Sequence, residues 1–233
     1  KSKKTGNSNF SEEEIARFDA LADSWWDPSG KYKTALEFNR ARLTVIKTQL
    51  ENHFGKGNLP PDYSALSIID IGSGGGLISE PLAALGAKVT GIDASSVSVE
   101  VAKRHALKSG VDVEYKHMLS SEAVMTGQQY DVVINAEVVE HVPNQRQLIN
   151  ECASLVKPGG LLILATLNRT IKSYVIAIVG AEYVMRYLSV GTHDWRKFVK
   201  PQELQAWVGD RFALKHQTGM RLNPFKGEWL TTP

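Results

Sequence analysis

Residues 68–77 read Ile-Ile-Asp-Ile-Gly-Ser-Gly-Gly-Gly-Leu, an apolar strand pattern that runs directly into a turn with four glycines. The residues that follow, 77–86, carry apolar side chains at helical spacing. Glycine lets the backbone turn sharply and lets a ligand approach it closely, because no Cβ stands in the way. The first residues of the helix after the turn offer unpaired N–H groups. The stretch therefore predicts a strand, a ligand-binding turn and a helix.

A second apolar strand pattern, at residues 88–92, ends at Asp93. In nucleotide-binding parallel sheets, a carboxylate at the end of the second strand reaches the ribose hydroxyls of an adenosine. A merely flexible glycine loop would not require this order of strand, turn, helix, strand and carboxylate. The pattern therefore indicates a pocket for a nucleoside cofactor.

The glycine spacing indicates which cofactor this is. The dinucleotide fingerprint G-x-G-x-x-G would need a glycine at Leu77. The chain instead has G-x-G-x-G at Gly72, Gly74 and Gly76, with Asp70 two residues ahead. This resembles motif I of the class I S-adenosylmethionine (SAM) methyltransferases. The resemblance implies that Asp70, Gly72 and Gly74 contribute to a SAM site.

Strand and helix patterns alternate along the rest of the chain. Such alternation predicts an α/β fold, a doubly wound and mostly parallel sheet with helices on both faces. Ligands of such sheets bind beyond the carboxyl ends of the strands, where the glycine turn, Asp93 and the residues after Asn135 fall. The strand patterns lie near residues 67–71, 88–92, 113–117, 130–135, 161–166 and 212–219, and the helical patterns near 77–86, 96–109, 144–156 and 201–209.

The two ends of the chain differ from this alternating part. A capping pattern at Ser11 opens an N-terminal helix. We expect residues 1–60 to form a helical lid and residues 61–233 the SAM-binding methyltransferase domain, with a helical insert at about 168–198. Nothing after the strand pattern of residues 212–219 corresponds to the last, antiparallel strand of the class I methyltransferase fold, so we expect that strand to be missing.

Composition excludes several classes of protein. The chain has 233 residues, of which 42% are hydrophobic and 22% charged, which suits a soluble α/β domain. A formal net charge of +2 and the lack of a long basic block give no sign of a nucleic-acid partner. The single cysteine, Cys152, excludes an internal disulfide and is expected to be a buried thiol on a helix. No run approaches the ~18 apolar residues of a membrane-spanning helix.

Three polar residues, Glu137, Glu140 and His141, follow the strand pattern of residues 130–135. If the segment forms one helical turn, the first glutamate shares a face with the other two residues, three and four positions later. Three convergent groups of this kind can hold a divalent cation. The alternative is a helix start, where acidic residues favour the helix dipole and the histidine is solvated or caps the helix. Spacing alone leaves both interpretations open.

Seven motifs together carry a closer resemblance. They occur in the order seen in the ubiquinone biosynthesis O-methyltransferase family, and the match covers roughly residues 11–226. The resemblance implies methylation of a catechol hydroxyl on polyprenylated ubiquinone precursors, and a SAM site lined by Arg42, Gly72, Asp93 and Ala136. A guanidinium fork suits the carboxylate of SAM. The motifs are residues 25–27, 70–76, 137–142, 155–160, 166–169, 179–183 and 191–194.

The family resemblance also implies a Mg²⁺ ion held by Glu137, Glu140 and His141. For a single in-line displacement on the SAM methyl group, the phenol oxygen must be an anion held close to that carbon. A divalent cation would lower the hydroxyl pKa and fix the substrate. Because Mg²⁺ prefers oxygen ligands, the histidine also admits a softer ion such as Mn²⁺ or Zn²⁺. Alternatively, His141 is a general base oriented by one of the two glutamates.

Residues 173–188 are too apolar for a loop, and too short and too charged to span a bilayer. An apolar helix pair with basic edges can lie in the lipid headgroup layer, where the polyprenyl tail of a substrate would stay. A lid packed on the domain is the alternative. We expect peripheral docking on the matrix side of the mitochondrial inner membrane, or in a bacterium a membrane-associated cytoplasmic protein, with a quinone-biosynthesis complex as a further partner. The flanking basic residues are Arg169, Lys172, Arg186, Arg196 and Lys197.

Three competing functions stay open at this point. A NAD-dependent oxidoreductase would share the fold, but Leu77 and the Glu-x-x-Glu-His cluster argue against it. A catalytically silent, membrane-docked scaffold in a quinone-synthesis complex would not need Gly72, Asp93 and that cluster, which speak for activity. The third is a methyltransferase acting on another small phenol.

Overall fold

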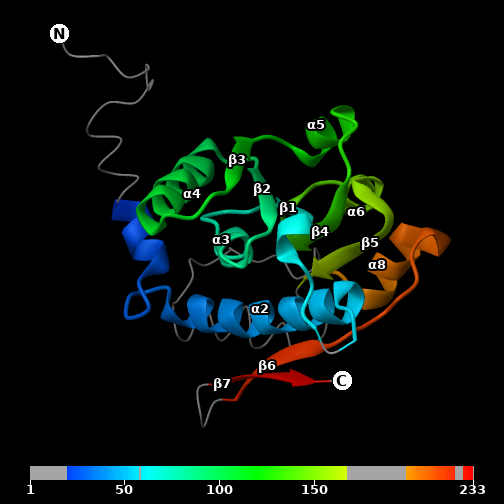
Figure 1. Ribbon diagram of the computed structural model, residues 1–233, viewed down its shortest axis with the longest axis horizontal. Helices are drawn as coiled ribbons and strands as arrows, with labels where there is room; N and C mark the ends of the chain where they lie inside the picture. Colours follow the sequence, from blue (N-terminus) through cyan, green and yellow to red (C-terminus); the bar gives the residue numbers. More distant parts are fainter. Residues whose placement is uncertain (1–19, 58, 167–197, 224–227, 233) are drawn as a thin grey trace.

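The computed structural model describes residues 20–57, 59–166, 198–223 and 228–232. At its centre lies a five-stranded sheet of order β3-β2-β1-β4-β5, in which every neighbouring pair is parallel (Figure 1). This confirms the predicted doubly wound α/β fold. The strands are β1 (Ser67–Ile71), β2 (Lys88–Asp93), β3 (Glu114–His117), β4 (Tyr130–Ala136) and β5 (Val156–Ala165).

Two of the helices begin at capping residues that the sequence supplies, whereas the helix predicted at residues 77–86 is shorter, Ser79–Ala83, and α5 is not predicted by the sequence. Ser95 caps α4 by accepting the N–H of Ser98, and Gly110, with φ of +67°, ends it. Asn144 caps α6 in the same way. Described residues 20–26 belong to the expected N-terminal helix, which ends at Trp26. The other helices are α2 (Lys33–Phe54), α3 (Ser79–Ala83), α4 (Ser96–Ser109), α5 (Ser120–Met125), α6 (Gln145–Ser154) and α8 (Pro201–Val208), with short 3₁₀ turns η1 (Tyr63–Ala65), η2 (Val139–His141) and η5 (Gly209–Arg211).

Two hydrophobic cores cover the two faces of the sheet. Successive residues of β1 point to opposite faces, so Ile68 packs with Leu50 of α2 and Leu82 of α3. Its neighbour Ile69 packs with Ile149 of α6 in the other core. Because helices cover both faces of the sheet, a ligand can reach it at the carboxyl ends of the strands.

The single cysteine lies inside the second core. Cys152, on α6, has no exposed surface and packs among the apolar side chains of that core. Burial raises the pKa of its thiol to about 12. The expectation of a buried thiol on a helix is confirmed.

The C-terminal part departs from the predicted strand at residues 212–219. Phe212 packs on the core, but Leu214 is 61% exposed, and polar side chains follow it, so this segment has no apolar face with which to join the sheet. The chain instead forms an antiparallel pair, β6 (Gly219–Asn223) and β7 (Glu228–Thr232). Among the described residues, no antiparallel strand joins the five-stranded sheet, because β7 pairs with β6 instead.

The antiparallel pair packs against α2 (Figure 1). The ring of Trp229, on β7, lies 4.6 Å from the ring of Phe38, centroid to centroid. On its own helix, Phe38 has the guanidinium carbon of Arg42 5.3 Å from its ring centroid. The C-terminal strand therefore supports the part of α2 that carries Arg42.

Several expectations concern residues outside the described part. The helix start at Ser11 and the insert at about 168–198 both lie there, and in the described part no helix is long and apolar enough to cross a bilayer. The division into a lid at residues 1–60 and a domain at 61–233 stays a prediction. Within the lid as predicted, α2 buries Leu50 in the core of the sheet.

Candidate active site

The glycine turn, residues 72–76, crosses from β1 towards α3 at the carboxyl ends of β1 and β2. The backbone N–H groups of Gly72 and Ser73 both donate to the carbonyl oxygen of Ile92, at 2.8 and 3.0 Å. Gly72 and Gly74 have φ of +77° and +52°, a region that side chains with a Cβ rarely adopt. A Cβ on Gly72 would collide with Val138. A Cβ on Gly74 would meet no heavy atom of the described residues within 4 Å, so the turn is open on that side.

Asp93 lies beside this turn, as the sequence predicts. One carboxylate oxygen accepts the N–H of Gly74 at 2.9 Å, and the other accepts the N–H of Ser95 at 2.8 Å. The side chain therefore fixes the turn to the end of β2. Each carboxylate oxygen has a second acceptor position, so this contact does not prevent Asp93 from also accepting a ribose hydroxyl.

Asp70 occupies the interior rather than the open side of the site. It is 2% exposed, and its carboxylate accepts the hydroxyl hydrogen of Ser79 at 2.7 Å, which connects β1 to α3. Burial raises the pKa of Asp70 to about 6, against the opposing effects of this hydrogen bond and of the nearby Arg42. In this position Asp70 joins β1 and α3, the two elements on either side of the glycine turn.

Arg42 connects α2 to both halves of the site. Its Nη1 lies 3.2 Å from a carboxylate oxygen of Glu137, and its Nη2 donates to the side-chain oxygen of Asn39 at 2.6 Å. Asn39, in turn, donates from its side-chain nitrogen to the carbonyl oxygen of Leu77 at 2.7 Å. The Nε of Arg42 is buried and has no hydrogen-bond partner among the residues that the structure describes. This chain of contacts joins the end of the glycine turn to the segment after β4.

Glu137 is held in a strained conformation. In the described part of the chain it is the one non-glycine residue with positive φ, at +59°. Its N–H donates to the carbonyl oxygen of Ala165 at the end of β5, at 2.8 Å. Such conformations cost roughly 1–3 kcal/mol and concentrate at functional sites. In this conformation the carboxylate of Glu137 pairs with Arg42.

The predicted metal ligands do not converge. Glu137 is paired with Arg42, and Glu140 is buried and accepts the hydroxyl hydrogen of Thr166 at 3.3 Å. His141 is exposed at the end of η2. Over the residues that the structure describes, no three His, Cys, Asp or Glu side chains form a group that could hold a metal ion. The three residues therefore do not fit a divalent cation as they are arranged here.

The end of β4 carries a residue whose contact the sequence does not predict. Asn135 is buried and donates from its side-chain nitrogen to the carbonyl oxygen of Ile71, at 3.2 Å, just before the glycine turn. It ties the ends of β1 and β4 together at the point where the strand order reverses. The next residue, Ala136, is half-buried and pairs with Ala165 of β5, so it lies at the same edge as the glycine turn. The sequence signal that could have indicated this contact is a polar residue, Asn135, at the end of an apolar strand.

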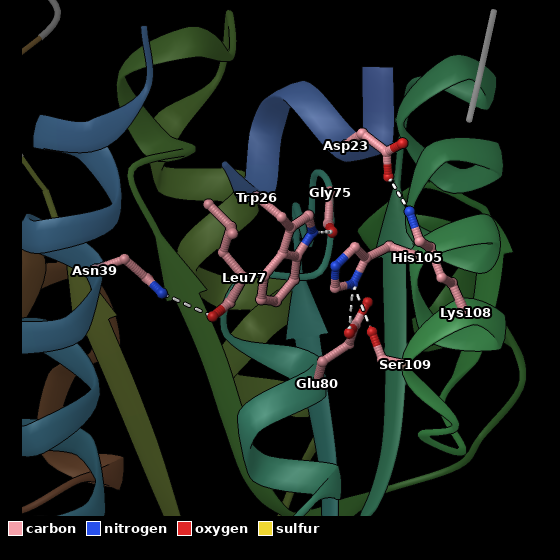
Figure 2. Close-up of polar contacts among 9 residues, drawn as sticks. All are labelled: Asp23, Trp26, Asn39, Gly75, Leu77, Glu80, His105, Lys108 and Ser109. Atoms are coloured by element: carbon pink, nitrogen blue, oxygen red, sulfur yellow. Dashed lines mark hydrogen bonds and ion pairs between the residues drawn. The ribbon is translucent and has the colours of Figure 1, made fainter. Parts of the chain in front are cut away.

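Two aromatic residues of the N-terminal helix also reach the glycine turn. The indole N–H of Trp26 donates to the carbonyl oxygen of Gly75 at 3.1 Å (Figure 2). The ring of Trp25 lies against the same glycine, because a Cβ there would stand 2.5 Å from Cε3 of the ring. The sequence indicates these tryptophans as part of a family motif, but not as neighbours of the turn.

The fold agrees with known protein structures. Residues 69–164 match the model of a family described as a methyltransferase domain. Magnesium protoporphyrin IX methyltransferase from Synechocystis PCC 6803, solved with bound S-adenosylhomocysteine (SAH), is similar with a TM-score of 0.58 at 21% identity, over 95% of this chain and 85% of that chain. A plantazolicin methyltransferase in complex with SAH gives a TM-score of 0.59 at 18% identity, over 84% and 76%. The fold and the site together define a class I SAM-dependent methyltransferase.

Relatives of higher identity define the family. The ubiquinone biosynthesis O-methyltransferase of Paramagnetospirillum magneticum is 46% identical over 224 residues, which are 95% of this chain and 90% of that protein. The protein of the same name from Chelativorans sp. is 44% identical over 218 residues, covering 93% and 86%. The chain belongs to the ubiquinone biosynthesis O-methyltransferase family and is a SAM-dependent O-methyltransferase.

Proposed function

We propose that the chain transfers the methyl group of SAM to one hydroxyl of a catechol that carries a polyprenyl tail, a precursor of ubiquinone. The observation that carries this proposal is the meeting of two segments at one edge of the sheet. The glycine turn, fixed by Asp93, and the strained segment at Glu137 follow adjacent strands, and Arg42 contacts the second while Asn39 holds the end of the first. Membership of the family supports the choice of substrate.

The reaction is a single displacement. The phenolate oxygen attacks the methyl carbon, the bond between that carbon and sulfur breaks, and neutral SAH leaves. The hydroxyl proton must pass to a base before or during attack. The proposed roles are Asp93 for the ribose hydroxyls and Arg42 for the carboxylate of SAM. The glycine turn would let the cofactor lie close to the backbone, with its methyl group directed towards the end of β4.

Two ways of making the phenolate are separated by experiment. No catalytic step is assigned to a metal ion here, because the three predicted ligands do not converge in this arrangement. The family resemblance predicts that a chelator abolishes turnover and that Mg²⁺ restores it. Full turnover by chelated, metal-free enzyme would contradict that prediction. In that case loss of activity in His141→Ala, with SAM binding retained, would identify the imidazole as the base.

The proposed reaction is tested with a soluble substrate. Purified protein is incubated with SAM labelled in the methyl group and a catechol with a short prenyl tail, and labelled methyl ether is measured. We expect transfer that depends on the prenylated catechol and falls strongly in Asp93→Ala. Transfer to an unprenylated phenol at the same rate would favour a methyltransferase of another small phenol. SAM binding without transfer to either substrate would favour the catalytically silent scaffold.

The partners and the location are part of the proposal. A polyprenyl tail keeps the substrate in a bilayer, so the enzyme must work at a membrane surface, and the basic and apolar pattern of residues 168–198 suits such docking. We place the protein at the matrix side of the mitochondrial inner membrane, or at the cytoplasmic membrane of a bacterium, in contact with other enzymes of quinone synthesis. Co-sedimentation with vesicles and fractionation of cells test this placement.

A further inference from the structure

The N-terminal helix that ends at Trp26 lies on the glycine turn. Both of its tryptophans contact Gly75: the ring of Trp25 covers the backbone, and the indole N–H of Trp26 holds the carbonyl oxygen. In Figure 2 the indole of Trp26 lies between the turn and the ring of His105. The helix therefore reaches the cofactor turn directly from another part of the chain.

A stack of side chains fixes the plane of this indole. The rings of Trp26 and His105, which belongs to α4, are stacked with centroids 3.9 Å apart and an angle of 4° between their planes. Nδ1 of His105 lies 2.7 Å from Oε2 of Glu80, on α3, and 3.1 Å from the hydroxyl oxygen of Ser109. The carboxyl group of Glu80 is almost fully buried. The imidazole of His105 is thus held by Glu80 and Ser109 through its Nδ1, while its face stacks on Trp26. We call Trp26, His105 and Glu80 the tryptophan stack.

The helix has its own attachment to α4. Asp23 pairs with Lys108 at 2.5 Å, and Ala22 is buried against Val101. The position of Trp26 is therefore set by packing on α4, independently of its contact with the turn. Because α4 fixes the position of the indole N–H, this donor can restrain the conformation of the glycine turn.

The turn needs restraint of this kind. A segment with four glycines can adopt many backbone conformations, and a ligand that must select one of them loses affinity. The carbonyl oxygen of Gly75 is held by Trp26, and that of Leu77, two residues later, by Asn39. Donors from two other helices thus hold Gly75, near the end of the turn, and Leu77, just after it, while Asp93 fixes the N–H of Gly74.

We propose that Trp26 is a positioning residue for the cofactor: its indole N–H, oriented by the stacked imidazole of His105, keeps the glycine turn in the conformation that receives SAM. Trp26 acts through the backbone of Gly75 and does not touch the reacting atoms. The inference rests on the proposed function, in which SAM lies against this turn.

The first test removes only the donor. Trp26→Phe keeps an aromatic ring on His105 and loses the N–H. We expect the Kd for SAH, measured by calorimetry, to rise about fivefold to tenfold, the effect of one neutral hydrogen bond, while kcat at saturating SAM stays within about twofold. The same substitution at Trp207, on α8, is the matched control and should leave the Kd unchanged. A wild-type Kd in Trp26→Phe would overturn the proposal.

The second test measures the turn itself. Hydrogen exchange at residues 72–77 should be faster in Trp26→Phe than in the wild type, with exchange in β4 unchanged. His105→Phe, which keeps a flat ring for stacking, should retain more SAH affinity than His105→Ala; equal affinities would contradict a role for the stack. If SAH does not slow exchange at residues 72–77 in the wild type, the placement of SAM, and with it the proposed function, fails instead.

Discussion

Gly72 and Gly74 restrict substitution for different physical reasons. Both have positive φ, but a Cβ on Gly72 would collide with Val138, while a Cβ on Gly74 would point into the open side of the turn. The first glycine therefore serves the packing of the turn on the segment after β4. The second leaves space for whatever binds above the turn.

This difference predicts that substitution by alanine has different effects at Gly72 and at Gly74. Gly74→Ala should lower the free energy of unfolding by about 1 kcal/mol, the cost of its positive φ, and weaken SAH binding by tenfold or more, since the new methyl group occupies ligand space. Gly72→Ala should cost about 3 kcal/mol because strain and overpacking add. Urea unfolding and calorimetry measure both. Equal losses of stability in the two variants would contradict the assignment of the open side to Gly74.

The pair of Glu80 and His105 predicts a dependence of stability on pH. Burial raises the pKa of Glu80 to about 8 and lowers the pKa of His105 from its usual value, so the folded pair holds one proton up to about pH 8. In the unfolded chain both groups are free of protons above about pH 6.5. The folded state therefore binds more protons than the unfolded state between these values. The stability that Glu80 contributes by keeping its proton is complete below its unfolded pKa, about 4.5, and is lost as pH rises through about 8. Between pH 6.5 and 8 the loss is about 2 kcal/mol.

Glu80→Gln tests this dependence, because an amide keeps the shape and does not titrate. We expect the free energies of unfolding in urea at pH 6.5 and at pH 8 to differ by about 2 kcal/mol less in the variant than in the wild type, because the titration of Glu80 is removed. The neighbouring charges Lys108 and Asp23 stay in place in both. The same pH dependence in the two proteins would show that the buried pair does not retain its proton.

At the scale of the elements, the sequence predicts those with local signals at both ends. The helix expected at residues 96–109 has these bounds in the structure, because Ser95 caps it and Gly110 ends it. β5 is longer at its start than the expected 161–166: it begins at Val156, since residues 157–160, Lys-Pro-Gly-Gly, join the strand across a register shift. Long-range pairing outweighs local turn preference there.

The candidate site follows the same rule. The contact between Gly74 and Asp93 could be predicted, because the carboxyl ends of neighbouring parallel strands meet. The cluster at residues 137–141 could not, since its prediction assumed a helical turn that puts all three side chains on one face. Positive φ at Glu137 breaks that periodicity and gives the carboxylate to Arg42, 95 residues away in the chain. No local pattern encodes such a distant partner.

The contact of β7 with α2 gives a prediction for one element. Trp229→Ala removes the ring that packs on Phe38 and should lower the free energy of unfolding by about 2 kcal/mol, less than a fully buried tryptophan because the side chain is only half-buried. Trp229→Phe should recover most of the loss. Urea unfolding measures both variants, and unchanged stability in Trp229→Ala would mean that the antiparallel pair contributes nothing to holding α2.

For the whole molecule, docking at a membrane surface is a prediction from the sequence pattern of residues 168–198. Arg169, Lys172 and Arg186 are expected to face anionic headgroups, and each basic residue near such a surface contributes about 1 kcal/mol. Replacing all three with glutamate should weaken binding to vesicles with anionic lipid about 100-fold, as measured by co-sedimentation.

A matched control is available on the described surface. Lys33, Arg40 and Lys103 are exposed, so the same triple reversal there changes the net charge equally. This control should bind vesicles nearly as the wild type does. Equal weakening in both variants would point to general charge attraction, and unchanged binding in both would favour a lid packed on the domain.

The lone thiol of Cys152 makes the folded enzyme a reporter of its own opening. Cys152 lies on α6, fully buried in the hydrophobic core, and burial raises the pKa of its thiol to about 12. A disulfide reagent, which reacts with thiolates, will therefore not label the native molecule. Labelling then proceeds no faster than the rate at which α6 separates from the sheet. Mass spectrometry of the wild-type protein at successive times of labelling would give the lifetime of the native state. The same measurement with bound cofactor would show how far the cofactor lengthens that lifetime.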